Sequence, residues 1–178
     1  MPLSDPQVSR SRIHSRRIEI QGFIRDDGLL DLLATLAVAE NADIIILAVK
    51  PYQMREVVGQ LRPALDANKV LVSVAAGITS GRLAQWAENA CPVVRCMPNT
   101  PALVGMGVFA LCFDDPDLPE TSKADIQALF SALGVCVELP ESKFTAFTAL
   151  IGAGPAYVFA MMQGLVQAGV TLGFQHKE

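Results

Sequence analysis

Short apolar runs rich in β-branched residues alternate along this chain with segments whose apolar residues recur at helical spacing. The runs occupy residues 43–49, 69–74, 92–97 and 107–113. Runs of this length that are apolar at successive positions are typical of strands covered on both faces. Residues 54–61, between the first two runs, instead place apolar side chains three or four positions apart, which predicts an amphipathic helix. The alternation predicts an α/β fold, with a mostly parallel sheet and helices on both faces.

The alternation ends near residue 140, after a further short strand expected at 135–139. Residues 144–175 then contain no Asp, Glu, Lys or Arg. A segment this apolar is long enough to span a bilayer, but Pro155 and the glutamines and glycines inside it favour a helix buried in protein on nearly all sides. We therefore expect an α/β domain over residues 1–140 and the start of a helical domain over residues 141–178.

The first 25 residues show no sustained period beyond a short strand-like stretch at 18–23. We expect most of this segment to be poorly ordered, as chain ends commonly are. A helix carrying an apolar stripe is expected to follow it, over residues 29–41.

Composition narrows the class of protein further. Hydrophobic residues make up 51% of the chain and charged residues 18%, which excludes general disorder. The net charge of −4 argues against nucleic acid as the main partner, because phosphate binding needs clustered basic side chains. The cysteines are Cys91, Cys96, Cys112 and Cys136. They form no C-x-x-C pair, so we expect reduced thiols, no metal site and a cytoplasmic location. His14 and His176 lie near the chain ends and are expected to be solvated.

Three of the predicted strands end in segments that suit ligand binding. The third run passes into Met97-Pro98-Asn99-Thr100-Pro101, where two prolines fix φ and remove two backbone donors. The first run closes with residues 48–51 and the second with residues 73–77. Open α/β sheets bind ligands outside the carboxyl ends of their strands, so these segments are candidates for one site.

Together with Gly152-Ala153-Gly154-Pro155-Ala156-Tyr157, these motifs resemble the pyrroline-5-carboxylate reductase family in their order and in their residues. The resemblance extends over residues 39–174. It implies a Rossmann-like nucleotide domain, followed by the start of an α-helical dimerisation domain that makes a homo-oligomer. It also implies reduction of 1-pyrroline-5-carboxylate to proline, the last step of proline biosynthesis, by hydride transfer from NADPH, with NADH as the alternative.

The resemblance also suggests which residues form the site. The residues carried over as cofactor-binding are Ala48, Val49, Lys50, Pro51, Ala75, Ala76, Gly77, Met97, Pro98 and Asn99. Those carried over as substrate-binding are Gly152, Gly154 and Pro155, where a turn is expected to expose a helix N-terminus to the substrate carboxylate. The matching segments provide no candidate for the catalytic proton donor.

Two features of the family are not found in the sequence. Residues 1–33 contain only Gly22 and Gly28 and no G-x-G-x-x-G turn, and no Thr-Ser-Pro-Gly-Gly-Thr-like substrate loop follows Gly154. We therefore expect a sheet that is incomplete at its N-terminal end. One alternative function is a non-catalytic fragment that acts by association with a partner or homologue. Another is a β-hydroxyacid dehydrogenase, which is disfavoured because no lysine lies between Lys143 and Lys177.

Overall fold

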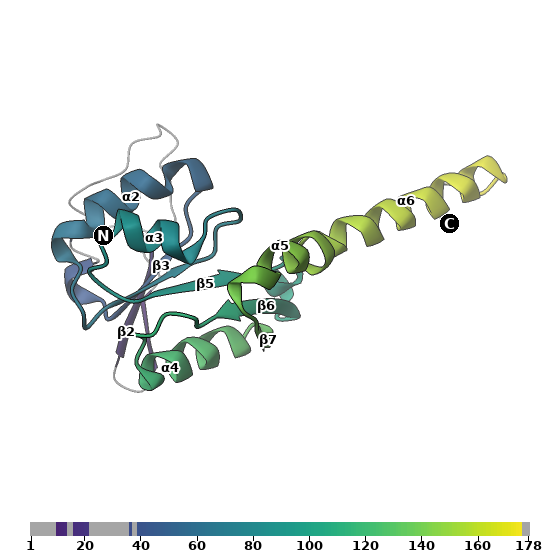
Figure 1. Ribbon diagram of the computed structural model, residues 1–178. Helices are drawn as coiled ribbons and strands as arrows, with labels where there is room; N and C mark the ends of the chain where they lie inside the picture. The colour runs from purple at the N-terminus through teal and green to yellow at the C-terminus, as the bar shows by residue number, and fades with distance from the viewer. Residues whose placement is uncertain (1–9, 14–15, 22–35, 37–38, 176–178) are drawn as a thin grey trace, which may run out of the picture.

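The computed structural model describes most of the chain and contains one mixed sheet (Figure 1). The described residues are 10–13, 16–21, 36 and 39–175. Their strands are β1 (Arg10–Ile13), β2 (Arg16–Gln21), β3 (Ile44–Leu47), β4 (Val70–Ser73), β5 (Val93–Met97), β6 (Gly107–Cys112) and β7 (Gly134–Glu138). They lie in the sheet in chain order. Strands β2 to β5 are parallel, β1 and β6 run antiparallel to their neighbours β2 and β5, and β7 is parallel to β6.

Helices cover both faces of this sheet, as the sequence predicts (Figure 1). Helices α2 (Met54–Leu61) and α3 (Ser80–Trp86) lie on one face, and α4 (Glu120–Ser131) lies on the other. The handedness of the connections explains this split. Strands β3 to β5 and strands β6 to β7 advance across the sheet in the same direction but run in opposite senses, so right-handed crossovers place their helices on opposite faces.

The buried side chains follow the same division, because successive residues of a strand point to opposite faces. Ile45, Leu47, Leu71 and Val93 join α2 and α3 in one cluster. Ile44, Ile46, Val70, Val72, Val94 and Cys96 join Ile126 and Phe130 of α4 in the other. The strands that read as continuous apolar runs are therefore covered on both sides.

The last part of the described chain is one long helical stretch, which we call the arm (Glu141–Thr171). It comprises a 3₁₀ turn (Glu141–Lys143), α5 (Phe144–Phe147), a π-helix (Thr148–Gly152) and α6 (Gly154–Thr171). The tight turn expected at Gly152–Pro155 is only a bend, at Ala153 between the π-helix and α6. Ala153 keeps right-handed helical geometry (φ −87°, ψ −8°), and Pro155 falls in the first turn of α6, where its missing N–H breaks no helical hydrogen bond.

The arm projects away from the sheet (Figure 1). Its base is fixed by Phe144 and Phe147, which pack with Ala110 and Cys112 of β6. Helix α6, by contrast, has no buried residue, so the expectation of a helix buried on nearly all sides is wrong for the single chain. Beyond its base, the described chain offers the arm no surface to pack against. By length and composition alone, the stretch Glu141–Thr171 could cross a membrane.

The N-terminal part differs from expectation at residues 10–13, which form a strand rather than a poorly ordered segment, whereas the short strand expected at 18–23 is found at 16–21. Ile18 and Ile20 alternate there with Arg17 and Glu19 in a period-2 pattern. Strand β2 pairs in parallel with β3, and Gln21 lies opposite Leu47. The predicted helix at 29–41 falls mostly outside the described residues, of which 36 and 39–41 are helical. His14 and His176 also fall outside them.

Candidate functional site

The three predicted site segments leave the sheet at a single edge. Strands β3, β4 and β5 are parallel and in register, with Leu47 opposite Ser73 and Ser73 opposite Arg95. Residues 48–51 and 74–77 follow the ends of β3 and β4 directly, and residues 97–99 begin with the last residue of β5. The structure therefore brings together the segments that the sequence nominated separately. Strand β2 ends at the same edge, one position along the sheet from β3.

Most of the residues that follow β3 and β4 face open space. Ala48, Lys50, Pro51, Ala76 and Gly77 are exposed. Gly77 has φ +77°, a conformation that glycine adopts without strain, and a β-carbon placed on it would meet no atom within 4 Å. Small side chains and open space at the strand ends allow a flat ligand to approach the backbone closely.

Two residues of these segments form the floor of the edge. Val49 and Ala75 are buried, and Ser73 Oγ accepts a hydrogen bond from the Ala75 backbone N–H at 3.3 Å. Gln53, in the 3₁₀ turn Pro51–Gln53, donates from its backbone N–H to the Lys50 carbonyl at 3.0 Å and so fixes the chain after Lys50. The floor is apolar, and the groups above it are small or positively charged.

Asn99 joins the end of β5 to two other segments. Its Oδ1 accepts a hydrogen bond from the Val108 backbone N–H at 2.9 Å, and its Nδ2 lies 3.5 Å from the Ile151 carbonyl oxygen. The resemblance made Asn99 a cofactor-binding candidate. In the structure the side-chain oxygen of Asn99 already accepts a hydrogen bond from β6, so a ligand would contact the side-chain NH₂ group instead.

The substrate-binding candidates lie in the arm, and one of them reaches the strand ends. A β-carbon on Gly152 would lie 3.2 Å from Met97 Cε, so glycine permits the π-helix to pack closely against the end of β5. A β-carbon on Gly154 would meet nothing within 4 Å. The structure thus brings Gly152 to the cofactor-side residue Met97 and leaves space around Gly154.

At the expected anion seat, the start of α6, two N–H groups are already used within the arm. The Ala153 N–H donates to the Thr148 carbonyl at 2.9 Å, and the Ala156 N–H donates to the Ala153 carbonyl at 3.0 Å. Pro155 has no N–H to offer. A carboxylate bound here would contact side chains rather than a row of unpaired N–H groups.

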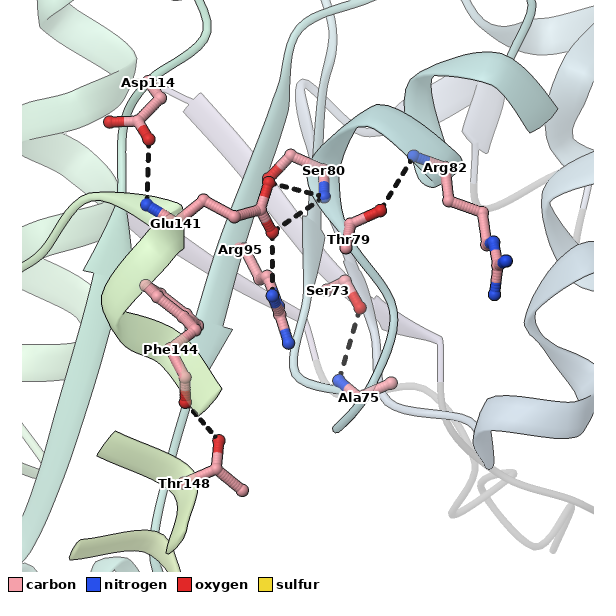
Figure 2. A network of polar contacts seen from close by, with 10 residues as sticks. All are labelled: Ser73, Ala75, Thr79, Ser80, Arg82, Arg95, Asp114, Glu141, Phe144 and Thr148. Carbon is pink, nitrogen blue, oxygen red and sulfur yellow. Dashed lines mark hydrogen bonds and ion pairs between the residues drawn. The ribbon is translucent and has the colours of Figure 1, made fainter. Parts of the chain in front are cut away.

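A polar network not anticipated from the sequence lies beside this edge (Figure 2). Arg95 of β5 is buried, and its Nη1 lies 2.7 Å from Glu141 Oε1. The Glu141 carboxylate also accepts the Ser80 backbone N–H, at 3.1 Å to each oxygen. The Glu141 N–H donates to Asp114 Oδ2 at 2.9 Å. An arginine inside an apolar strand is the one sequence signal of such a network, because a buried charge needs a partner.

All four cysteines are free thiols, and three are buried. Burial raises the pKa of the Cys91 and Cys112 thiols to about 11, and it raises the pKa of Cys96 further. Thiols with raised pKa values are poor nucleophiles at neutral pH. Within residues 10–175 as far as they are described, no group of three or more His, Cys, Asp or Glu side chains is arranged to hold a metal ion.

A hollow of about 670 Å³ lies at the opposite edge of the sheet, lined by Cys91, Pro92 and Asp115 among others. Pro92 precedes β5, so this hollow is at the amino ends of the strands. Asp115 accepts the Val93 N–H at 2.9 Å and is committed to the loop. The hollow is therefore separate from the site that the motifs form.

Two family models match parts of the chain. One is described as pyrroline-5-carboxylate reductase dimerisation and matches residues 141–178. The other is described as NADP oxidoreductase, coenzyme F420-dependent, and matches residues 30–77. The first covers the arm and the second includes β3, β4 and the segments that follow them.

Curated relatives cover the region between these matches. A pyrroline-5-carboxylate reductase of Pseudomonas aeruginosa is 41% identical over 138 residues, which is 77% of this chain and 50% of the relative. One of Corynebacterium melassecola is 37% identical over 169 residues, 91% of this chain and 61% of the relative. The chain thus spans between half and three-fifths of the length of these relatives.

Solved structures of such reductases share the fold. The pyrroline carboxylate reductase of Plasmodium falciparum with NADP bound superposes with a TM-score of 0.75 and 33% identity, over 80% of this chain and 54% of that one. The pyrroline-5-carboxylate reductase of Coxiella burnetii gives 0.73 and 32%, over 80% and 53%. Four-fifths of this chain therefore follows a known arrangement.

Proposed function

This chain belongs to the pyrroline-5-carboxylate reductase family, and we propose that it binds NADPH along the carboxyl edge of β3, β4 and β5 and reduces 1-pyrroline-5-carboxylate to proline. The observation that carries this proposal is the meeting of four separate motifs at one edge. Residues 48–51, 74–77 and 97–99 leave adjacent parallel strands, and Gly152 of the arm packs against Met97.

The edge suits the nicotinamide end of the cofactor. Ala48, Ala76 and Gly77 leave room for a flat ring close to the backbone, and Val49 and Ala75 make an apolar floor that excludes water. Lys50 is exposed at the same edge, where its ammonium group can meet an anionic or carbonyl part of the ligand. The bound dinucleotide supplies the hydride, so the protein's task is to position the two reactants.

NADPH is favoured over NADH by two comparisons. The Plasmodium falciparum relative was solved with NADP bound, and the family model matching residues 30–77 is described as an NADP oxidoreductase. The side chains that would read the adenosine ribose are not identified among the described residues. NADH therefore remains the competing cofactor for the experiment below.

We assign the substrate side to Gly152, Gly154 and Pro155. Gly152 is in contact with Met97, and the space around Gly154 opens beside the same π-helix. On this proposal the imino acid lies between the arm and the strand ends. The relatives described above are pyrroline-5-carboxylate reductases, which favours this activity over that of a β-hydroxyacid dehydrogenase.

The arm supports a homo-oligomer as the working form. Ten large apolar side chains between Tyr157 and Phe174 are exposed on a stretch that matches the dimerisation model. A helix that is apolar around its whole circumference is normally covered by protein. A cytoplasmic location belongs to the same proposal, and the free thiols support a reducing compartment.

The test is oxidation of NADPH, followed by absorbance, with purified chain and 1-pyrroline-5-carboxylate, together with circular dichroism to show that the chain is folded. Cofactor binding is measured separately by energy transfer from Trp86, the single tryptophan, to the reduced nicotinamide. Turnover supports the proposal, with NADH run alongside to compare cofactors. Binding without turnover would favour the alternative in which the chain acts by association alone. A folded chain that binds neither cofactor would overturn the proposal.

A variant at Gly154 sharpens this test. Gly154→Trp should abolish turnover and leave NADPH affinity within about threefold, because the added ring fills the substrate space without meeting the fold. Gly59→Trp is the matched control, since Gly59 on α2 also has no atom within 4 Å of a β-carbon and is remote from the strand ends. Unchanged turnover in Gly154→Trp would remove the substrate role from this part of the arm.

A further inference from the structure

The buried Arg95–Glu141 pair lies between two elements that the proposed site depends on. Arg95 sits on β5, two residues before Met97, and Glu141 opens the arm. The side chain of Arg95 is 8% exposed and that of Glu141 is 28% exposed, and their closest atoms are 2.7 Å apart. A pair of this kind is shielded from water and holds its two elements at a fixed separation.

The pair occupies the face of the sheet that carries α3. Odd-numbered β5 residues point to this face, because Val93 packs in the cluster that contains Leu83 and Ala87. Arg95 therefore lies between α3 and α5, and Figure 2 shows its side chain reaching toward Glu141 beside Ser80. Its guanidinium also stacks over the ring of Phe144, the first residue of α5, with 4.8 Å to the ring centroid.

Glu141 ties this pair to two loops, one that follows β4 and one that follows β6. Its carboxylate accepts the Ser80 N–H, and Ser80 begins α3 directly after the segment that contains Ala75, Ala76 and Gly77. Its own N–H is held by Asp114, which follows β6. A single side chain thus links the end of β4, the end of β5 and the start of the arm.

The arm reaches the strand ends seven or more residues after Glu141, in the π-helix Thr148–Gly152, and its contacts there are weak. Met97 meets Gly152, and Asn99 Nδ2 lies 3.5 Å from the Ile151 carbonyl oxygen. Neither contact is strong enough to set the angle of a helix by itself. The strong contacts at the base of the arm are those of Arg95, Phe144 and Phe147.

We propose that Arg95 and Glu141 are positioning residues, which hold the π-helix Thr148–Gly152 at the distance from Met97 and Asn99 that the imino acid requires. This inference rests on the proposed function for the identity of the ligand, but the positioning itself is a property of the chain. Cofactor contacts along β3 and β4 depend on the strands and survive without the pair. The contacts of the imino acid depend on the arm and are lost without the pair.

The test uses three site variants and one control in the full chain. Arg95→Met removes the charge and keeps the length, Glu141→Gln keeps an acceptor for the Ser80 N–H, and Arg95→Lys keeps the charge but loses the flat stacking group. Lys123→Met is the control, because it removes an exposed pair of 3.0 Å with Glu138, between α4 and β7 on the other face. Thermal unfolding followed by circular dichroism shows that each variant is folded.

The first measurement is hydrogen exchange of backbone amides and needs no ligand. In Arg95→Met and Glu141→Gln we expect exchange of residues 144–153 to rise at least about tenfold while that of β3 and β4 stays unchanged. Arg95→Lys should lie in between, and Lys123→Met should match the wild type. A uniform rise over the whole sheet, or no rise in the arm, would overturn the proposal.

The second measurement separates the two ligands. Arg95→Met should bind NADPH within about threefold of the wild type, while its apparent affinity for the imino acid in the presence of cofactor should fall at least about tenfold. An equal loss of both affinities would contradict the positioning role. A wild type that binds neither ligand would end the proposed function, and the exchange result would still decide whether the pair positions the arm.

Discussion

The α/β body (residues 39–138) and the arm use the same apolar residue types in opposite ways. Phe109 of β6 is 2% exposed and stacks on Phe130 with ring centroids 5.2 Å apart, whereas Phe159 of α6 is 65% exposed. The body finds covering surfaces for its strands within the chain. The arm does so only at its base, through Phe144 and Phe147. The same apolar residue types therefore stabilise the fold of the body and form an exposed apolar surface on the arm.

The largest expected difference comes from removing one aromatic ring in each region. Phe109→Ala should lower the free energy of unfolding by about 3–5 kcal/mol, because it leaves a cavity between the sheet and α4. Phe159→Ala should change it by no more than about 0.5 kcal/mol, because the ring has no buried contacts to lose. Urea unfolding followed by circular dichroism, at concentrations low enough to avoid association, measures both. Similar losses in the two variants would mean that the arm is part of the body's core.

Two glycines sharpen the same contrast at the level of the backbone. Gly134 has φ +151°, and a β-carbon on it would lie 2.0 Å from the Gly107 carbonyl oxygen. Gly134→Ala should therefore destabilise the chain by at least about 1–3 kcal/mol. Gly164→Ala, in α6, meets nothing within 4 Å and should stabilise the arm helix by roughly 0.5–1 kcal/mol. Thermal unfolding and helical ellipticity report the two effects, and a stable Gly134→Ala would contradict the close β6–β7 packing.

The strands that could be predicted from the sequence are those whose apolar runs are buried within the chain. Residues 44–47, 70–73 and 93–97 were recognisable because both of their faces are covered. Their parallel order then placed the three site segments at one edge. That edge follows from strand direction alone.

Features that depend on distant partners could not be predicted in the same way. Gly152 and Gly154 suggested a tight turn, but the arm only changes there from a π-helix to α6, and glycine is accepted in both. Glu141 lies 46 residues from Arg95, and no local pattern connects them. The exposure of α6 could not be predicted either, because a helix covered by its own chain and a helix covered by a second chain have the same composition.

A dependence of stability on pH is a further difference, and it belongs to the body alone. All four cysteines lie there, and burial raises the pKa of the Cys91 thiol to about 11. Below about pH 8.5 the thiol is protonated in both the folded and the unfolded chain, so the folded state keeps its full stability. Between about pH 9 and 11 the unfolded chain ionises first, and stability should fall by at most about 2–3 kcal/mol.

Comparison with Cys91→Ala isolates this thiol from the other groups that titrate at high pH. The fall in the urea midpoint between pH 8 and pH 10.5 should be smaller in Cys91→Ala than in the wild type. The helical signal of the arm should not change in this range because of thiols, since residues 144–175 contain none. An identical fall in both proteins would mean that Cys91 ionises as easily in the folded chain as in the unfolded one.

The most direct test of the difference between body and arm is sedimentation equilibrium of the wild type beside Leu165→Glu. Leu165 is 69% exposed on α6, so the charge should leave the fold intact while it disfavours burial of the arm against a second copy. The account predicts that the wild type associates at micromolar concentration and that Leu165→Glu is monomeric with an unchanged unfolding transition. A wild type that remains a monomer throughout this range would contradict it.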